Sequence, residues 1–589
     1  MILALLACTP MEEPSVESPV GALGLGRNNP FPSVELVADG QVALEAGDLP
    51  VAAEGQDWDF TPFNLRTGFS VAQPSIVMFE QPIDEASVGG QEQVGIDGSV
   101  RMVDLDSGAA IPCFAELDAA DDAILTGERT LIVRPMMAMT PGHTVAVVVT
   151  SKVTSGGAPL DLPPPEGHYA DLHAQLADLG YDDVSVAWDF PVGEGRALLD
   201  GVLGALPVPT AHSFTRTWTN TDESPAPEGV WKQLEGSFTT ANWLVDETHV
   251  ELDASGAAVS QGTREAYLWV TIPEIVRDSG PYSIPVLIFG HGIMSEPDDY
   301  LGGEEDSEGV RALAEELGAI VIATKWTGLT GDDRLHALEV AADFARFHEV
   351  PEMLVQGVAD TSALVKYVAE GDLLQDEVFA SLADPTNIYY YGISLGGIEG
   401  SVMFANQSTI PRGVFHVGGA AWATMLERSA QWPPFDIVAS REYPDPWDRQ
   451  LLYAATQVLW DPVDPAAHAD RMVGREMIWQ ESMGDEQVPN LTTELLMRSV
   501  GATLATPSVS TPYGLVPTAM TTTAPTLVQY DPEVGYPDPV NRPGASSGAH
   551  SIPRSWPGCI QQSAQFLAAG DVVHFCGEAA CSASNPGSW

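Results

Sequence analysis

Positively charged side chains are scarce in this chain. Its 589 residues include 25 lysines and arginines against 82 aspartates and glutamates, a formal net charge of −57. The lysines are Lys152, Lys232, Lys325 and Lys366. A surface this acidic repels nucleic acid and anionic lipid headgroups, so we expect no nucleic-acid partner. The charge suits an extracellular protein, although a lineage-wide acidic composition would produce it too.

Long apolar runs are also lacking. After the first residues, no stretch approaches the ~18 apolar residues that a membrane-spanning helix requires. The chain starts Met-Ile-Leu-Ala-Leu-Leu-Ala-Cys-Thr-Pro, a short apolar run that ends at Cys8 with no basic residue before it. This start resembles a bacterial lipoprotein signal, in which the cysteine is lipidated and becomes the new N-terminus.

The resemblance implies that residues 1–8 are a signal remnant and that a lipid on Cys8 attaches the protein to a membrane. Residues 9–26, rich in Pro, Glu, Ser and Gly, would then be a flexible tether. An ordinary apolar N-terminus is the alternative. We expect a protein of the bacterial cell envelope, either anchored in the outer membrane or secreted, and we expect a monomer.

Cysteine is rare, with five residues in the chain. Besides Cys8 these are Cys113, Cys559, Cys576 and Cys581, three of them near the C-terminus. In an exported protein this grouping indicates disulfides, either Cys576–Cys581 or Cys559–Cys576. A Cys-x₄-Cys pair with a single histidine nearby is a weak zinc signal, so we predict no metal site.

The most informative motif is Gly392-Ile393-Ser394-Leu395-Gly396. It directly follows the β-branched and aromatic run Asn387–Tyr391, and Leu395–Ala405 can form a helix. A serine on a sharp strand-to-helix turn has its hydroxyl exposed, as in the nucleophile elbow of α/β-hydrolases. Gly392 and Gly396 are needed because a Cβ there would collide with neighbouring backbone. Ser394 is therefore the candidate nucleophile.

A catalytic acid is expected after a later strand. Glu476–Glu481 has a strand pattern and runs into a Gly-containing turn that carries Asp485. Asp485 would orient the catalytic imidazole and stabilise its charged form. Asp461 and Asp464 are rivals, but their Asp-Pro-Val-Asp-Pro setting is typical of a turn. An ordinary surface aspartate is the other interpretation of Asp485.

The general base should follow the acid in the chain. His468 comes before the acid strand and is out of order. His550 follows the candidate strand Thr526–Tyr530 and a loop rich in Pro, Gly and Ser, and it precedes a candidate last helix, Gly558–Leu567. His574 lies in an extended C-terminal segment. We predict His550 as the base, with His574 as the rival.

The second part of an oxyanion hole should lie after an earlier strand. The buried strand pattern Ile284–Phe289 runs straight into Gly-His-Gly-Ile-Met. We predict that the backbone N–H groups of Ile293 and Leu395 face the developing oxyanion, with Met294 as the alternative to Ile293. His291 precedes the nucleophile in the chain, which favours a structural role.

The N-terminal part of the chain has a different pattern from the rest. Short strand patterns separated by turn residues recur from Phe69 to Lys152, as in an antiparallel β-sandwich, and we expect this domain to span 27–155. Met139–Val147 resembles the last hairpin of a bacterial Ig-like module. Residues 156–235 mix helix and strand patterns and are interpreted as a connecting region.

From 236 to 575, strand and helix patterns alternate, which predicts a mostly parallel sheet with helices on both faces. Glu265–Ile272 is expected to pair with Ile284–Phe289, and Asp333–Ala369 is expected to be a helix broken near Pro351. Residues 576–589 would form a C-terminal tail.

An insertion at 421–465 interrupts this alternation. It is rich in aromatic residues and prolines. Such a segment could be a lid that shapes a pocket for an acyl or aromatic group. A small satellite core over the sheet is the alternative.

These motifs make the C-terminal part similar to the α/β-hydrolase superfamily of serine esterases and lipases. The N-terminal part resembles that of bacterial virulence-factor-type lipase lipoproteins, through Asn29-Pro30-Phe31-Pro32-Ser33, Thr67-Gly68-Phe69-Ser70 and Pro82-Ile83-Asp84. The predicted fold is thus an α/β-hydrolase preceded by an all-β, Ig-like sandwich domain.

The resemblance implies Ser394, Asp485 and His550 as the catalytic triad and an ester of a lipid as substrate, with no cofactor. A polyester depolymerase or a serine peptidase would use the same triad. A non-catalytic surface adhesin or scaffold is a further alternative. In another interpretation, the β-domain binds a polymer or cell surface while the hydrolase acts on what is held.

Overall fold

The computed structural model describes residues 30–127, 129–221, 224–303, 305–306, 308–519 and 525–589. Cys8 and the tether at 9–26 lie outside these residues, so their roles stay predictions. In the described part of the chain, no helix has the length and apolar character needed to cross a membrane.

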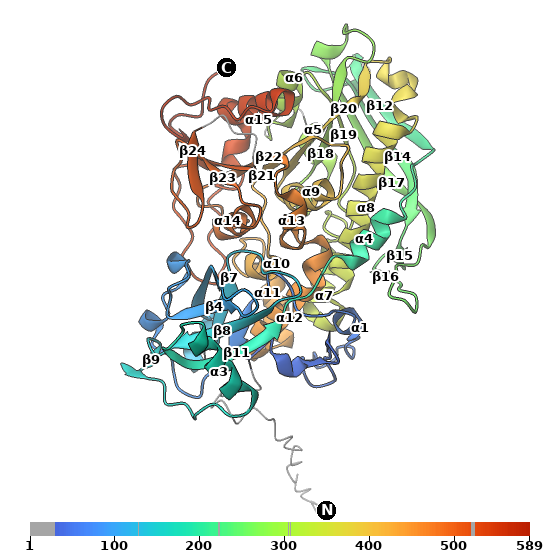
Figure 1. The fold of residues 1–589 in the computed structure, drawn as a ribbon. Helices are drawn as coiled ribbons and strands as arrows, with labels where there is room; N and C mark the ends of the chain where they lie inside the picture. The colour runs from blue at the N-terminus through green and yellow to red at the C-terminus, as the bar shows by residue number, and fades with distance from the viewer. Residues whose placement is uncertain (1–29, 128, 222–223, 304, 307, 520–524) are drawn as a thin grey trace, which may run out of the picture.

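A sheet of thirteen strands organises the C-terminal part of the chain (Figure 1). Its order is β13-β12-β14-β17-β19-β18-β20-β21-β22-β25-β23-β24, with β26 paired to β25. The pairs from β13 to β19 are antiparallel, and those from β19 to β24 are parallel. The bounds are β12 His212–Thr221, β13 Ser224–Pro225, β14 Val230–Asn242, β17 Gly262–Pro273, β18 Ile284–Gly290, β19 Ile320–Ala323, β20 Ala383–Ile393, β21 Arg412–His416, β22 Glu476–Ser482, β23 Thr503–Thr506, β24 Val516–Ala519, β25 Thr526–Asp531 and β26 Cys581–Ser582.

Alternate side chains of the central strands enter two hydrophobic cores, one on each face of the sheet. In β18, Val286 and Ile288 belong to one core, and Leu287 and Phe289 to the other. Helices α8 and α9 pack in the first core, and α6 and α15 in the second. Their bounds are Glu349–Glu370, Leu395–Ala405, Val310–Leu317 and Pro557–Ala569 respectively. A mostly parallel sheet with helices on both faces confirms the predicted α/β-hydrolase architecture.

The prediction that Glu265–Ile272 pairs with Ile284–Phe289 is wrong. Strand β17 is hydrogen-bonded to β19, and β18 lies on the other side of β19. The chain that leaves β18 returns through α5 (Pro297–Leu301) and α6 as a crossover to a parallel strand. That crossover brings β19 between β17 and β18, so neighbours in sequence are not neighbours in the sheet.

The helix expected over Asp333–Ala369 consists of two helices. Helix α7 (Arg334–Ala342) ends before a 3-10 turn at Phe344–Arg346, and α8 starts at Glu349. Pro351 lies in the first turn of α8, where its missing N–H removes no helical hydrogen bond. Two shorter helices, α13 (Ala469–Met472) and α14 (Asn490–Ser499), flank β22 in the chain.

The N-terminal region has its own antiparallel sheets, with strand orders β11-β8-β4-β5 and β3-β7-β6. The strands are β3 Ser75–Val77, β4 Val100–Asp104, β5 Ala110–Ile111, β6 Cys113–Leu117, β7 Leu131–Pro135, β8 Thr144–Thr150 and β11 Val184–Pro191. Short pairs accompany them, namely β1 Val37–Ala38 with β2 Gln41–Val42, and β9 Thr154–Ser155 with β10 Ala158–Pro159. Helices α1 (Thr61–Asn64) and α2 (Asp121–Thr126) show that the region is not purely β. The resemblance of this region to an Ig-like domain stays a prediction.

Both expected boundaries, at 155 and 236, differ from the observed sheets. Strand β11 pairs with β8 of the N-terminal region, although it lies after residue 155. Strand β12 and the first part of β14 belong to the large sheet, although they precede residue 236. Helices α3 (His168–Asp178) and α4 (Ala197–Gly204) flank β11, and the pair β15 Leu244–Val245 and β16 His249–Val250 follows β14. A local strand pattern does not reveal which sheet the strand joins, because pairing is set by distant partners.

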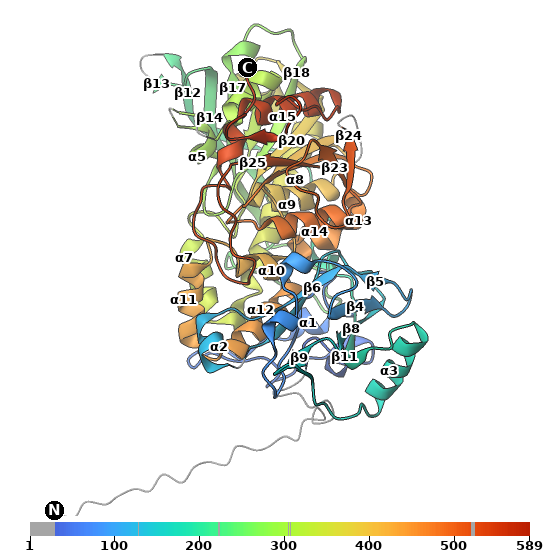
Figure 2. The ribbon, with the colours of Figure 1, turned by 90° about the vertical axis from the view of Figure 1, so that its left-hand side faces the viewer.

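The insertion at 421–465 forms helices α10 (Trp422–Leu426), α11 (Pro433–Glu442) and α12 (Pro446–Trp460). They lie between the N-terminal region and the large sheet in both views (Figures 1 and 2). Glu116 and Arg134 of the N-terminal region form buried ion pairs with Arg428 and Glu427, which follow α10. Breaking a buried ion pair leaves an uncompensated charge, so the N-terminal region is firmly joined to the insertion.

Candidate active site

Ser394 occupies the sharp turn between β20 and α9. Its φ of 58° and ψ of −116° lie outside the regions that non-glycine residues favour, so the serine is held in a strained conformation. Its N–H donates to the carbonyl of His416 at 2.9 Å. Among the described residues, no group hydrogen-bonds to its hydroxyl, which is left available to a reacting group.

The two glycines of the motif allow the backbone to approach closely here. A Cβ on Gly392 would overlap the carbonyl oxygen of Gly396, and a Cβ on Gly396 would overlap that of Gly290. The hydroxyl of Tyr390 donates to the Gly396 carbonyl at 2.5 Å. The turn thus fits only if positions 392 and 396 have no side chain.

Asp485 and His550 form a buried hydrogen-bonded pair. Nδ1 of His550 lies 2.9 and 2.8 Å from the two carboxylate oxygens of Asp485. The N–H groups of Gln487 and Val488 also donate to Asp485, at 2.8 and 2.9 Å. Because a carboxylate only accepts hydrogen bonds, Nδ1 carries a proton, and in the neutral ring Nε2 then has a free lone pair. That is the tautomer that a general base needs.

The three candidate residues follow the carboxyl ends of parallel strands in one sheet. Ser394 comes after β20, Asp485 after β22, and His550 in the loop between β25 and α15. Acid and base are in contact, whereas the described residues include no direct hydrogen bond between Ser394 and His550. Such a bond often forms only when substrate is present.

The first part of the proposed oxyanion hole lies in the loop after β18. The N–H of Met294 donates to the carbonyl of Leu329 at 2.7 Å and is therefore occupied. The N–H groups of Ile293 and Leu395 have no hydrogen-bond partner among the described residues, and both residues line one cavity with Ser394. Because the N–H of Met294 is occupied, Ile293 is the better candidate of the two for the oxyanion donor.

His291 is a structural residue of this loop. Its Nε2 accepts from the N–H of Trp326 at 2.9 Å, and its Nδ1 lies 2.8 Å from the carbonyl of Gly292. Burial lowers the pKa of His291 to about 4, so the ring is neutral at neutral pH. The hydroxyl of Ser295 also donates to the Gly292 carbonyl, at 2.8 Å. Together these bonds fix the backbone on either side of Ile293.

An apolar cavity opens beside Ser394. The centre of a water molecule can move through about 90 Å³ of it. Every described residue that lines it is uncharged, and the walls come from the nucleophile turn, the segment from α7 to α8, and the insertion. The aromatic members are Phe344, Phe347, Trp422, Trp432, Phe435 and Trp460. The insertion therefore contributes to a pocket, while other parts of it, such as Trp447 and Leu452, are packed in the core.

The rival carboxylates serve other contacts. Asp464 accepts from the N–H groups of Ala421 and Trp422, both at 2.9 Å, and so fixes the start of α10. Asp461 accepts from the hydroxyl of Ser70 in the N-terminal region. The rival His468 is fully buried, with Nε2 3.0 Å from the carbonyl of Pro462. Neither aspartate contacts His550 by a hydrogen bond in the described chain.

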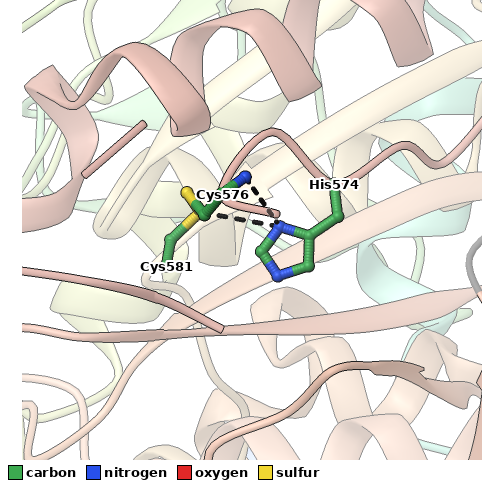
Figure 3. A group of neighbouring side chains, drawn as sticks. All are labelled: His574, Cys576 and Cys581. Carbon is green, nitrogen blue, oxygen red and sulfur yellow. Dashed lines mark hydrogen bonds between the residues drawn. A yellow bond between two sulfur atoms is a disulfide. The ribbon is translucent and has the colours of Figure 1, made fainter. Parts of the chain in front are cut away.

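His574 lies beside the disulfide between Cys576 and Cys581 (Figure 3). Its Nδ1 accepts from the N–H of Cys576 at 3.4 Å and lies 3.7 Å from the sulfur of Cys581. Of the two disulfides considered, Cys576–Cys581 is therefore the one observed, and Cys559 is a buried free thiol. The group could not bind a metal in this form, because disulfide sulfurs are not thiolates.

The other group of possible metal ligands is Asp104, Asp106 and His143 in the N-terminal region. Asp104 already accepts from His143 at 2.8 Å and from two backbone N–H groups of its own turn. These bonds account for the cluster without a metal.

Sequence reasoning missed residues that hold the loop carrying His550. Glu486, Ser482 and Asn541 are all buried and hydrogen-bonded to that loop or within it. The sequence offered one signal for a role of Glu486. It directly follows Asp485, and a catalytic triad needs only one carboxylate in that turn.

No family model matches this chain, and no curated protein matches it. Among solved structures it is similar to acetyl xylan esterase 1 from a Thermoanaerobacterium species, at 14% identity over 60% of this chain and 92% of that one, with a TM-score of 0.35. It is also similar to an esterase from Pyrobaculum calidifontis, at 14% identity over 52% and 82%, with a TM-score of 0.29. A rice cell wall degrading esterase from Xanthomonas oryzae matches at 15% identity over 61% and 97%, with a TM-score of 0.32.

Proposed function

We propose that this protein is a serine-dependent carboxylic ester hydrolase with Ser394 as nucleophile, His550 as general base and Asp485 as the acid that orients the base. The observation that carries the proposal is the buried Asp485–His550 pair, in which Nδ1 faces the carboxylate at the sheet edge that also presents the strained Ser394. This division of roles is that of a catalytic triad.

In the proposed first step, the oxygen of Ser394 attacks the ester carbonyl carbon while Nε2 of His550 takes the hydroxyl proton. The carbonyl oxygen becomes an oxyanion, which accepts hydrogen bonds from the N–H groups of Ile293 and Leu395. When the intermediate collapses, the alcohol leaves with the proton from His550, and an acyl-enzyme is formed.

In the second step, His550 takes a proton from water, and the resulting hydroxide attacks the acyl-enzyme. The acid is released as Ser394 recovers its proton from His550. Loss of one oxyanion donor typically costs roughly 10²–10³ in rate, so the fixed position of the loop around Ile293 contributes to the reaction beside the triad.

The cavity supports an ester of an apolar acyl group as the substrate. Its described lining has no charged side chain, and six aromatic rings contribute to it. An acyl chain gains free energy when it leaves water for such a surface. A lipid or other acyl ester fits this lining better than a peptide with charged side chains.

The test uses the full-length chain and p-nitrophenyl esters from C2 to C16, with Ser394→Ala in parallel. Hydrolysis by the wild type that is lost in the variant supports the proposal, and the preferred chain length separates an esterase from a lipase. A fluorophosphonate probe should label the wild type at Ser394. Absence of both hydrolysis and labelling would contradict the proposal and favour a scaffold role.

We also propose that Cys8 anchors this enzyme in the cell envelope, on the strength of the Leu-Leu-Ala-Cys sequence that ends at it. In a bacterial host, Cys8→Ala should move the protein from the membrane fraction to the soluble fraction. An unchanged distribution would contradict the anchor.

A further inference from the structure

The carboxylate of Glu486 is buried against the short segment that ends in His550. It accepts hydrogen bonds from the hydroxyl of Ser547 at 2.9 Å, the N–H of Gly548 at 3.1 Å and the N–H of His550 itself at 3.3 Å. Glu486 is 1% exposed. No part of the proposed reaction needs this carboxylate.

The segment needs such an anchor because it belongs to a long irregular loop. Between the end of β25 at Asp531 and the 3-10 turn that starts at Ile552, the chain has no helix or strand. Each free residue of a loop has conformational entropy that must be lost when its position is fixed. A base on this loop would sample many positions unless other groups held it.

Three anchoring groups come from the end of β22 and from the turn after it, which carries the catalytic acid. The hydroxyl of Ser482, at the end of β22, donates to the carbonyl of Ala549 at 2.6 Å. Asp485 holds the ring of His550, and Glu486 holds its backbone. The carbonyl of Glu486 also accepts from the N–H of Ala430 in the insertion, at 2.7 Å.

We propose that Glu486 is a positioning residue of the active site, which sets the place of His550 by accepting three hydrogen bonds from residues 547–550. The inference rests on the proposed function for its effect on catalysis. Its effect on the loop does not depend on that function. Glu486 touches neither substrate nor the reacting atoms and acts only through His550.

The chemistry requires a carboxylate at this position. Two oxygens with several lone pairs can satisfy three donors, whereas a glutamine amide has a single acceptor oxygen and an NH₂ group that would face a donor. A buried donor without a partner is costly, so the segment should move to find one. Because the two side chains are nearly equal in size, Glu486→Gln removes the carboxylate and its negative charge without leaving a cavity.

The experiment compares wild type, Glu486→Gln and Ser547→Ala on the preferred p-nitrophenyl ester. We expect Glu486→Gln to lower kcat about 10- to 100-fold, since a misplacement of about 1 Å can cost 10² in rate. KM should change less than about threefold, because Glu486 does not line the acyl cavity. Ser547→Ala removes one of three donors and should lower kcat about two- to fivefold, the equivalent of one ordinary hydrogen bond.

Hydrogen exchange gives a readout that does not depend on activity. Amides of residues 545–552 should exchange faster in Glu486→Gln, while those of β20 and α9 should not change. Glu533→Gln is the matched control: Glu533 is an exposed glutamate of the same loop whose carboxylate accepts from Ser584, far along the chain from His550. It should match the wild type in both measurements.

Equal exchange of residues 545–552 in Glu486→Gln and wild type would overturn the inference, whether or not the protein hydrolyses esters. So would an unchanged kcat in an active enzyme, or a rise in KM with kcat intact. A wild type that neither hydrolyses esters nor reacts with fluorophosphonate would instead overturn the proposed function. If Glu486→Gln fails to fold, an unchanged kcat and unchanged exchange in Ser547→Ala would still overturn the inference.

Discussion

The side-chain nitrogen of Asn541 lies 3.0 Å from the carboxylate of Asp118, although 423 residues separate the two in the sequence. The same nitrogen lies 3.0 Å from Glu427, and the amide oxygen accepts from the N–H of Ala119 at 2.8 Å. One buried amide thus joins the N-terminal region, the insertion and the loop that carries His550. The N-terminal region is therefore part of the support of the candidate active site.

Replacing Asn541 by alanine should loosen this junction. The carboxylates of Asp118 and Glu427 would lose a donor and the N–H of Ala119 its acceptor, which should lower the free energy of unfolding by about 2–4 kcal/mol. We also expect kcat to fall, because the loop before His550 loses its link to the N-terminal region. Thermal unfolding and ester hydrolysis measure the two effects.

The neighbouring Arg542 offers the control for Asn541. It forms an exposed ion pair with Asp121 at 3.0 Å, and such pairs contribute about 0–1 kcal/mol. Arg542→Ala should therefore behave like the wild type. Equal effects of the two substitutions would show that the buried amide has no special role.

Gly396→Ala should abolish the nucleophile turn. The added methyl group would overlap the carbonyl of Gly290, which is backbone at the end of the central strand β18 and cannot move aside. We expect a loss of more than about 3 kcal/mol or no soluble protein, and no labelling by fluorophosphonate.

Gly535→Ala is the control for that substitution, because a Cβ there meets open space. It should give normal yield and labelling. A Gly396→Ala protein that folds and reacts normally would contradict the tight turn.

Trp432→Ala should shift acyl specificity toward longer chains. Trp432 lines the cavity and stacks on Phe435 with ring centroids 5.6 Å apart. Removal of its indole enlarges the cavity at a cost of about 3–5 kcal/mol in stability. The measurement is kcat/KM across the C2 to C16 esters, normalised to the C2 ester.

Leu335→Ala serves as the control, because Leu335 is on α7 but 74% exposed and outside the cavity lining. Its chain-length profile should match that of the wild type. If Trp432→Ala has the same profile too, the cavity is not the acyl site.

Asp461→Asn should change how stability depends on pH. Burial raises the pKa of Asp461 from 3.8 to about 7, although Arg66 opposes the rise. Between these values the folded state keeps a proton that the unfolded state has lost. The contribution of this group to the free energy of unfolding is therefore fully present below about pH 4. It is lost as the pH rises to about 7, by up to ~1.4 kcal/mol per pH unit.

The asparagine variant has no such proton, so its free energy of unfolding should fall less between pH 5 and pH 7 than that of the wild type. Denaturant unfolding at both pH values measures the difference. Asp278→Asn changes an exposed aspartate and the same net charge, and it should retain the wild-type pH dependence. Identical slopes for wild type and Asp461→Asn would rule out a raised pKa at Asp461.

Local patterns in the sequence were sufficient to predict several features of the candidate site. The strand, turn and helix around Ser394 could be predicted because hydrophobic runs and glycines specify them over a few residues. The order of Ser394, Asp485 and His550 could be read directly from the chain. The contact between Asp485 and His550 agrees with that order, because both follow parallel strands whose ends meet at one edge of the sheet.

Other features depend on which distant segments meet. The preference for Ile293 over Met294 follows from a hydrogen bond to Leu329, and the place of β19 follows from a crossover that steps back toward β17. Glu486 and Asn541 looked like ordinary polar loop residues until burial brought donors and acceptors to them. A hydrogen bond between residues far apart in the chain has no signature in either local sequence, so only the packed fold could reveal these contacts.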